Sequence, residues 1–370
     1  MVANMTRQPH GARTDPVLCL RGIGPAEVAA GWTDPETRAR IPGLAWVDLA
    51  DDGLTDLPED LGQATGLQRL DASGNRLARL PENLAALRNL TRLDLSGNRL
   101  TRVPEVIAEM TDLVSLRLGD NEIDELPSWI ERLPRLRALD VSGNRLTSLP
   151  DSVGRLSGLR RLHVARNRLD SLPDSLGELT GLARLVAADN RLAAVPSCVT
   201  RLSGLVSLDL SGNKLAHAED LAHVADHVQW LDLSRNHLGV LPGRPLGGEG
   251  LTSLIVSGNR LEDVPDWIGG LSRLSKLDIN DNALDRVPSA VRPLTALNWL
   301  GLAGNRISTL PDWLAGFGDL SRLYLGRNRI AELPDWVSRL SGLLKLELSG
   351  NPLTRLPDRV GEFPFADIEV

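Results

Sequence analysis

A histidine-rich stretch at residues 217–227 carries the side chains best suited to metal chemistry. The segment "AHAEDLAHVADHVQW" follows Leu215 and breaks the pattern of the surrounding chain. If it forms a helix, Asp220, His223 and His227 fall on one side, at spacings of three and four residues. Imidazole and carboxylate groups are common ligands of divalent metals. The stretch suggests a metal-dependent or peptide-modifying enzyme as one alternative, and a solvated helix without metal as the other.

Residues 20–30, "LRGIGPAEVAA", offer backbone amides rather than side chains. This stretch resembles the helix-hairpin-helix motif of DNA-binding proteins, in which a Gly-hydrophobic-Gly turn donates amides to a phosphate, and Gly22, Ile23 and Gly24 match that turn. The segment before the turn is too short for the first helix of the motif, and basic residues are few. DNA or phosphate binding here is therefore a weaker alternative to a plain capping helix.

The rest of the chain shows little sign of enzyme chemistry. It contains no Gly-Lys-Ser/Thr phosphate loop and no Cys-x-x-Cys pair, so we expect a protein that is not an enzyme and needs no cofactor. The formal net charge of −7 makes nucleic acid an unfavourable partner. No segment is apolar enough for a signal peptide or a membrane span, which predicts a cytoplasmic location. The preference for Arg over Lys suggests a bacterial source, and the oligomeric state is left open.

A strict repeat explains most of the chain. Asparagine recurs every 23 residues, and Asp52 stands one period before the first of these asparagines. The thirteen asparagines are Asn75, Asn98, Asn121, Asn144, Asn167, Asn190, Asn213, Asn236, Asn259, Asn282, Asn305, Asn328 and Asn351. Each sits in the frame L-x-x-L-x-L-x-x-N-x-L-x-x-L-P-x-x-L-x-x-L. A fixed period of this length predicts stacked repeats that share one continuous core.

Each repeat position has a physical reason. Leu93 and Leu95 are two residues apart, so both point to one face of a short strand. Leu100 and Ile107 follow at spacings that suit a turn or short helix facing the same interior. The amide of Asn98 can donate to and accept from backbone groups of its own and neighbouring repeats. Repeated along the chain, these amides predict an internal hydrogen-bonded ladder.

This pattern resembles the leucine-rich repeat family, in particular its 23-residue "L-P-x-x-L/I" type. The resemblance implies an α/β solenoid of about 14 repeats, with a parallel sheet on the concave side and turns or short helices on the convex side. It also implies a binding protein that uses the concave side. The expected divisions are a disordered tail at 1–15, a helical cap at 16–43, the repeat array at 44–358 and a C-terminal cap at 359–370.

Partner choice should lie where the repeats differ on the outward face of the strands, because a partner would touch those residues. One cluster replaces the usual acidic residues with basic ones; the alternatives are an anionic docking patch and a solvated charge mosaic. The other cluster gathers aromatic and basic residues, the types that most often dominate binding energy. The first cluster comprises Arg160, Arg161, His163, Arg166 and Arg184. The second comprises Lys276, Asn280, Asp281, Trp299, Arg322, Tyr324 and Arg327.

Trp230 occupies the same outward column as Trp299 and is a further candidate contact. An outward tryptophan on a sheet face has little structural purpose unless it packs on neighbouring side-chain stems. We therefore expect a non-enzymatic scaffold that holds a protein or peptide on the outward face of its strands.

Overall fold

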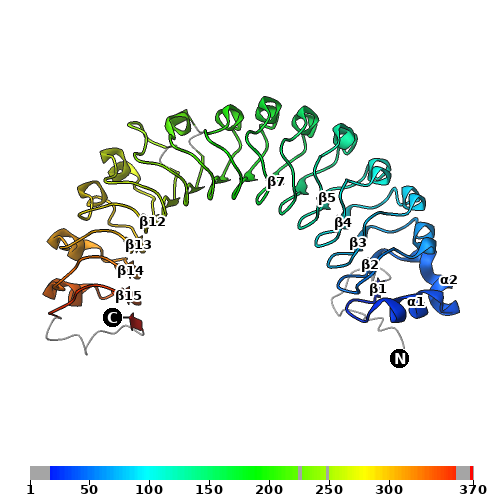
Figure 1. Cartoon of the computed structure of the whole chain (residues 1–370), viewed down its shortest axis with the longest axis horizontal. Helices are drawn as coiled ribbons and strands as arrows, with labels where there is room; N and C mark the ends of the chain where they lie inside the picture. Colours follow the sequence, from blue (N-terminus) through cyan, green and yellow to red (C-terminus); the bar gives the residue numbers. More distant parts are fainter. Residues whose placement is uncertain (1–16, 224–226, 247–249, 356–366, 370) are drawn as a thin grey trace. The chain divides into compact units, whose positions relative to one another are not determined.

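The computed structural model describes residues 17–223, 227–246, 250–355 and 367–369. The expected tail at 1–15 lies outside this range, as do residues 359–366 and 370 of the expected C-terminal cap. The chain divides into two compact units, residues 1–185 and 186–370. Both are built from short strands that alternate with short 3-10 helices (Figure 1). The fold is an α/β solenoid, as the repeat predicts.

The first unit begins with a strand, two α-helices and a 3-10 turn before the regular alternation starts. Its strands are β1 (Val17–Cys19), β2 (Trp46–Asp48), β3 (Arg69–Asp71), β4 (Arg92–Asp94), β5 (Ser115–Arg117), β6 (Ala138–Asp140) and β7 (Arg161–His163), and β8 (Arg184–Val186) falls at the division. Its helices are α1 (Pro25–Thr33), α2 (Pro35–Arg40), η1 (Ile41–Gly43), η2 (Glu59–Gln63), η3 (Glu82–Ala86), η4 (Glu105–Glu109), η5 (Ser128–Arg132), η6 (Asp151–Arg155) and η7 (Asp174–Glu178).

The second unit continues the same alternation. Its strands are β9 (Ser207–Asp209), β10 (Trp230–Asp232), β11 (Ser253–Ile255), β12 (Lys276–Asp278), β13 (Trp299–Gly301), β14 (Arg322–Tyr324), β15 (Lys345–Glu347) and β16 (Asp367–Glu369). Its 3-10 helices are η8 (Ser197–Arg201), η9 (Glu219–His223), η10 (Asp266–Gly270), η11 (Ser289–Val291), η12 (Asp312–Gly316) and η13 (Asp335–Arg339).

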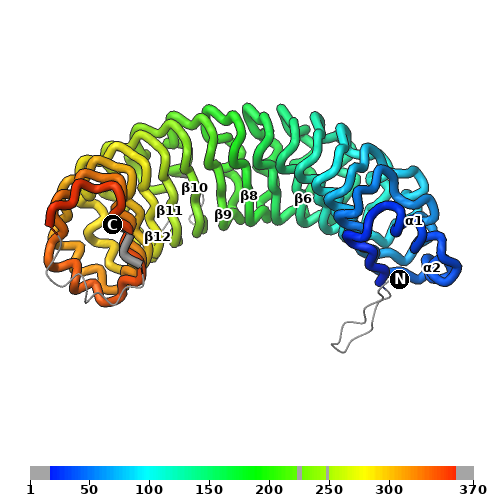
Figure 2. The backbone as a smooth tube through the Cα atoms, turned by 60° about the horizontal axis from the view of Figure 1, so that its bottom comes forward, coloured from blue at the N-terminus to red at the C-terminus, as the bar shows by residue number. Residues whose placement is uncertain are grey.

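Within each unit the strands pair in parallel with a fixed register, so that equivalent residues of successive repeats lie side by side. Leu93 pairs with Leu116, for example, and Leu300 pairs with Leu323. The strands line the inner face of each unit and the 3-10 helices line the outer face (Figures 1 and 2). This register places each outward column of the sequence in one continuous row.

The core of each repeat consists of the apolar positions of the frame. Leu93, Leu95, Leu100 and Ile107 are at most 1% exposed. A single repeat could not bury these side chains alone, because each packs between the layers before and after it. The outward residue Asp94 is partly exposed, so the strands have one buried and one accessible face.

The predicted asparagine ladder is confirmed. Asn144 donates from Nδ2 to the carbonyl oxygens of Leu118 at 2.9 Å and Val141 at 3.0 Å, and its Oδ1 accepts from the Ile123 amide at 2.9 Å. Equivalent bonds surround Asn98 in the first unit and Asn305 in the second. Each asparagine thus joins its own turn to the preceding repeat.

The sheet begins earlier in the chain than the expected array start at residue 44. Strand β1 pairs with β2, because Val17–Cys19 places Leu18 beside Val47 and extends the parallel register. Helices α1 and α2 follow β1, and Val28 and Trp32 of α1 are buried. At the other end of the chain, β16 pairs with β15 in the same register.

Candidate functional site

Three residues of the second cluster, Lys276, Trp299 and Tyr324, lie together with Lys345 on the second unit. The rings of Trp299 on β13 and Tyr324 on β14 lie 5.0 Å apart at an interplanar angle of 39°. The Lys276 Nζ lies 4.7 Å from the centre of the Trp299 ring, and the Lys345 Nζ lies 6.0 Å from the Tyr324 ring. Both arrangements allow a cation–π attraction. We call these four residues the aromatic platform.

A glycine gives the platform its shape. Gly301 takes the position that holds Asp in many repeats, and a Cβ atom there would lie 2.6 Å from the Trp299 ring. The ring therefore lies over the backbone of its own strand, where a longer side chain would displace it. Trp299 remains partly exposed in this arrangement, so its ring is accessible to a partner.

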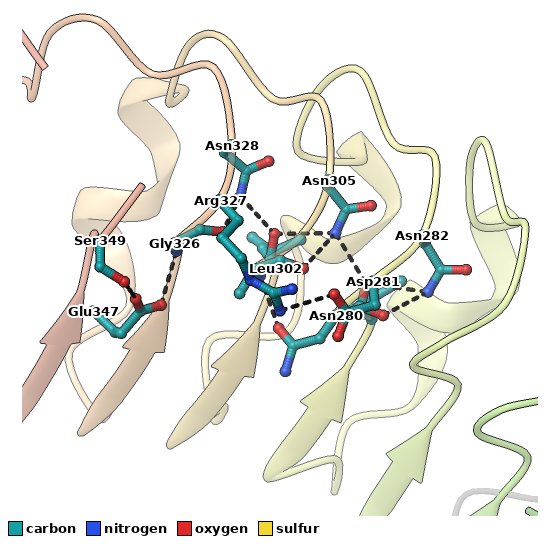
Figure 3. A network of polar contacts seen from close by, with 12 residues as sticks. Asn280, Asp281, Asn282, Leu302, Asn305, Gly326, Arg327, Asn328, Glu347 and Ser349 are labelled. Carbon is teal, nitrogen blue, oxygen red and sulfur yellow. Dashed lines mark hydrogen bonds and ion pairs between the residues drawn. The ribbon is translucent and has the colours of Figure 1, made fainter. Parts of the chain in front are cut away.

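Two charged side chains beside the platform differ in their partners: Glu347 is hydrogen-bonded within the unit, whereas, among the described residues, Arg322 is not. The Glu347 carboxylate is held by two hydrogen bonds. It accepts one from the Gly326 amide of the preceding repeat at 2.9 Å and one from the hydroxyl of Ser349, two residues further along the chain (Figure 3). Arg322 is exposed and forms no side-chain hydrogen bond or ion pair with any residue that the structure describes. Burial raises the pKa of the Asp278 carboxyl on the neighbouring strand β12. The platform thus offers a free guanidinium beside two stacked rings.

Arg327 and Asp281 form an ion pair with each other. The Arg327 Nη2 lies 2.9 Å from the Asp281 Oδ1, two repeats away, and the pair crosses the repeat that contains Gly304 (Figure 3). Both backbones adopt positive φ, at 51°. This conformation is uncommon for residues with a side chain, and glycine occupies the position in other repeats.

The same arrangement recurs elsewhere. Arg166, from the first cluster, pairs with Asp120 at 3.0 Å across Gly143, and Arg235 pairs with Asp189 at 3.0 Å across Gly212. We call each set an Asp–Gly–Arg bridge. Sequence reasoning assigned Arg166, Asp281 and Arg327 to partner binding and missed these bridges. The available signal was the residue just before the repeat asparagine, where Asp and Arg alternate with Gly at a spacing of two repeats.

The bridges predict that replacing a bridging glycine by alanine lowers stability more than replacing an equivalent glycine outside a bridge. A Cβ at Gly143 would lie 2.2 Å from the Asp120 Oδ1, whereas a Cβ at Gly97 meets nothing closer than 3.4 Å. Both glycines have positive φ, so alanine costs about 1 kcal/mol at either position. We expect Gly143→Ala to cost about 0.5–1 kcal/mol more than Gly97→Ala in urea unfolding, because it also displaces Asp120 from Arg166.

The extra cost should disappear when both glycine variants are compared in an Asp120→Ala background, since the displaced carboxylate is then already absent. Equal costs for Gly143→Ala and Gly97→Ala in the wild-type background would contradict the bridge.

The remaining residues of the first cluster lie on or beside β7 and β8. Arg161 and Arg184 are exposed, and Arg160 lies against Gly181. Burial lowers the pKa of His163, and the neighbouring cations Arg184 and Arg161 lower it further, although Asp140 opposes them. His163 Nδ1 lies 3.9 Å from the Asp140 carboxylate, and its buried Nε2 has no hydrogen-bond partner in the described part of the chain.

Trp230 lies two strands before Lys276. In register, Trp230 on β10 pairs with Ser253 on β11, and Ser253 pairs with Lys276. Ser253 is only 8% exposed, although it lies in the outward column. The structure therefore places Trp230 in the same row as the platform, separated from it by one small buried residue.

The histidine-rich stretch begins with η9, a 3-10 helix of five residues that ends at His223. Residues 224–226 and the side chain of His223 lie outside the described residues, so the predicted metal set remains untested. Among the side chains that are described, no three of His, Cys, Asp or Glu lie close enough together to hold a metal ion.

The Gly22–Ile23–Gly24 turn uses its amides internally. The Asp52 Oδ1 accepts from the amides of Ile23 at 2.8 Å and Gly24 at 3.1 Å, and the Gly22 amide donates to the Ala50 carbonyl at 3.0 Å. Phosphate binding by this turn, as in a helix-hairpin-helix motif, is therefore wrong for this structure, because the amides that would bind the phosphate are already occupied.

Comparisons with known proteins agree with this architecture. The family profile described as "Leucine-rich repeat region" matches residues 112–280, and the profile described as "Leucine Rich repeats (2 copies)" matches residues 65–108 and 88–131. A search of the curated proteins returned no match.

None of the described helices combines the length and the apolar composition required to cross a membrane.

Several solved structures are similar to the whole chain. A leucine-rich repeat protein of Leptospira interrogans is 27% identical, with a TM-score of 0.69, over 90% of this chain and 98% of its own. The leucine-rich effector YopM of Yersinia pestis is 25% identical, with a TM-score of 0.69, over 89% of this chain and 83% of its own.

The ectodomain of a plant receptor kinase is also similar to this chain. The ectodomain of the Arabidopsis thaliana receptor kinase GASSHO1/SCHENGEN3, solved in complex with CASPARIAN STRIP INTEGRITY FACTOR 2, is 29% identical, with a TM-score of 0.63. The match covers 87% of this chain but only 43% of the receptor chain.

With its repeat frame, parallel strands and asparagine ladder, this chain belongs to the leucine-rich repeat family.

Proposed function

We propose that this protein is a non-enzymatic scaffold that binds a protein or peptide on the strand-lined face of its second unit. The observation that carries the proposal is the aromatic platform, in which Trp299 and Tyr324 stack at 5.0 Å while Trp299 stays partly exposed. Aromatic and arginine side chains dominate the energy of most interfaces. Arg322, which is exposed in the same row, adds a directional donor to the platform.

Two observations, one on similar structures and one on the platform, support a polypeptide ligand. The similar structures include the plant peptide hormone receptor RGFR1 in complex with RGF2, and the structure of PEPR1-AtPEP1. The platform itself presents two tilted aromatic rings beside two ammonium groups, which suits a peptide with an apolar side chain flanked by acidic ones. We further propose a cytoplasmic location, since no disulfide joins Cys19 and Cys198 in the described part of the chain.

A random peptide library displayed on phage tests the proposal directly. Peptides selected on the full chain would be synthesised with a fluorescent label, and their dissociation constants would be measured by fluorescence polarisation. We expect Trp299→Ala/Tyr324→Ala to weaken binding at least about tenfold, because it removes two stacked contact residues. Circular dichroism would verify that the variant keeps the fold.

Trp313→Ala is the matched control, because it removes a tryptophan from η12 on the outer side of the same unit, where the ring packs on Phe317 at 5.8 Å. Binding should change less than about twofold in this variant. Peptides that bind the platform variant as well as the wild type, or a library that yields no binding peptide, would refute the proposal.

A further inference from the structure

The strand face of the first unit contains a hollow of about 350 Å³. It arises from the sizes of successive residues in one outward column, where Trp46, Arg69 and Arg92 are followed by the small residues Ser115 and Ala138. Arg161 follows Ala138 and lines the far side of the hollow. The small side chain of Ser115 on β5 lines the hollow between Arg92 and Arg161.

The hollow carries unbalanced positive charge. Among the described residues, the side chains of Arg69, Arg92 and Arg161 form no hydrogen bond and no ion pair, although all three are exposed. Arg117, also in the lining, is neutralised by Asp94 at 3.2 Å. The acidic lining residue Asp71 is directed toward its own turn, where it accepts hydrogen bonds from the Ser73 amide at 3.0 Å and the Ser73 hydroxyl at 2.6 Å.

We infer that this hollow, which we call the arginine pocket, binds carboxylate side chains of an acidic segment of a partner polypeptide. A guanidinium group presents parallel donors that match a carboxylate, so uncommitted arginines around a hollow favour such a ligand. Trp46, which is 36% exposed at the edge of the pocket, offers an apolar surface to the residues between the acids. An acidic segment is thus complementary to both the charge and the apolar rim.

The strand spacing sets the spacing of the acidic residues. Arg92 on β4 and Arg161 on β7 are three strands apart, which corresponds to about 14 Å at the usual distance between strands. An extended chain advances about 3.3 Å per residue, so a segment crossing the strands would place its acidic residues about four positions apart. The residues between them would lie over Ser115 and Ala138.

A long nucleic acid is the less favourable occupant. The chain has a formal net charge of −7, so an extended polyanion would meet repulsion beyond the pocket, whereas a short acidic segment contacts the local cluster of cations alone. The pocket is independent of the aromatic platform, because it lies in the other unit and shares no residue with it. Failure of either proposal would leave the other standing.

A labelled peptide tests the pocket in the full chain. The probe is fluorescein-labelled Gly-Glu-Glu-Gly-Phe-Gly-Glu-Glu-Gly, and its control has Gln at every Glu. We expect the Glu peptide to bind the wild type at low salt in fluorescence polarisation and the Gln peptide to bind at least about tenfold more weakly. The double variant Arg69→Gln/Arg92→Gln should weaken binding of the Glu peptide by a similar factor.

Arg76→Gln/Arg99→Gln is the matched control, since it removes the same charge from the same two repeats outside the pocket. Its binding should stay within about twofold of the wild type. Ser115→Trp tests the hollow without any change in charge, and it should weaken binding at least about fivefold by filling the space. Circular dichroism would establish that each variant is folded.

Three outcomes would overturn the inference. Absence of binding to the wild type would reject the pocket, and equal losses in the two arginine pairs would assign the attraction to net charge alone. Full displacement of the peptide by millimolar inorganic phosphate, with unchanged binding to Ser115→Trp, would identify a site for free anions instead of a polypeptide segment.

Discussion

Replacing Asn144 by alanine should lower the free energy of unfolding by about 2–4 kcal/mol. The side chain is 7% exposed, donates to the Leu118 and Val141 carbonyls and accepts from the Ile123 amide. Its removal leaves these backbone groups buried without partners, and each unsatisfied buried group costs about 1–3 kcal/mol unless water enters. Urea unfolding followed by circular dichroism would measure the change.

Asn89→Ala is the matched control for this prediction. Asn89 also donates to a carbonyl of the preceding repeat, the Thr65 oxygen at 2.8 Å, but it is exposed to solvent. Water can replace that bond, so we expect a cost below about 1 kcal/mol. If the two alanine variants were equally stable, the buried ladder would not be a principal source of cohesion between the repeats.

Replacing Asp52 by alanine should destabilise the N-terminal region by about 2–4 kcal/mol. Asp52 is 2% exposed and accepts the amides of Ile23 and Gly24, and Gly24 is the N-cap residue of α1. A carboxylate at this end of a helix satisfies free amides and interacts favourably with the helix dipole. Hydrogen exchange of the amides at residues 23–33 would rise strongly in the variant.

Two further variants separate this role from general charge effects. Asp52→Asn keeps an acceptor for the two amides and should lose less than half as much stability as Asp52→Ala. Asp56→Ala removes an exposed acid whose partner Arg79 lies 3.3 Å away, and it should change stability by at most about 0.5 kcal/mol. The proposed cap would be wrong if Asp52→Ala behaved like Asp56→Ala.

Asp52 also shows how an exception to the repeat can be structural. At the other repeats an asparagine donates to the carbonyl of the repeat before it, as Asn98 does to Ala72. Asp52 instead faces the amides of the Gly22–Ile23–Gly24 turn, which require an acceptor. The sequence shows the substitution of Asp for Asn, but the amides that explain it are placed by the packing of the turn against the first repeats.

The sequence by itself determined the solenoid, the parallel strands, the buried leucines and the asparagine ladder. These features depend on spacing along the chain, and a 23-residue period places equivalent residues in the same environment in every repeat. The outward orientation of Trp299, Tyr324 and Arg322 could also be predicted, because alternation along a strand decides which residues face outward.

Only the tertiary structure decided how the outward side chains pair. Trp299 lies over Gly301, and Arg327 reaches across a whole repeat to Asp281. Arg69 and Arg92 line a hollow and have no side-chain partner among the residues that the structure describes. The differences in energy between alternative exposed ion pairs are small, so the sequence alone does not select one of them. The sizes of neighbouring residues and the positive φ of the bridge positions select among them, and these are properties of packing between repeats rather than of any single repeat.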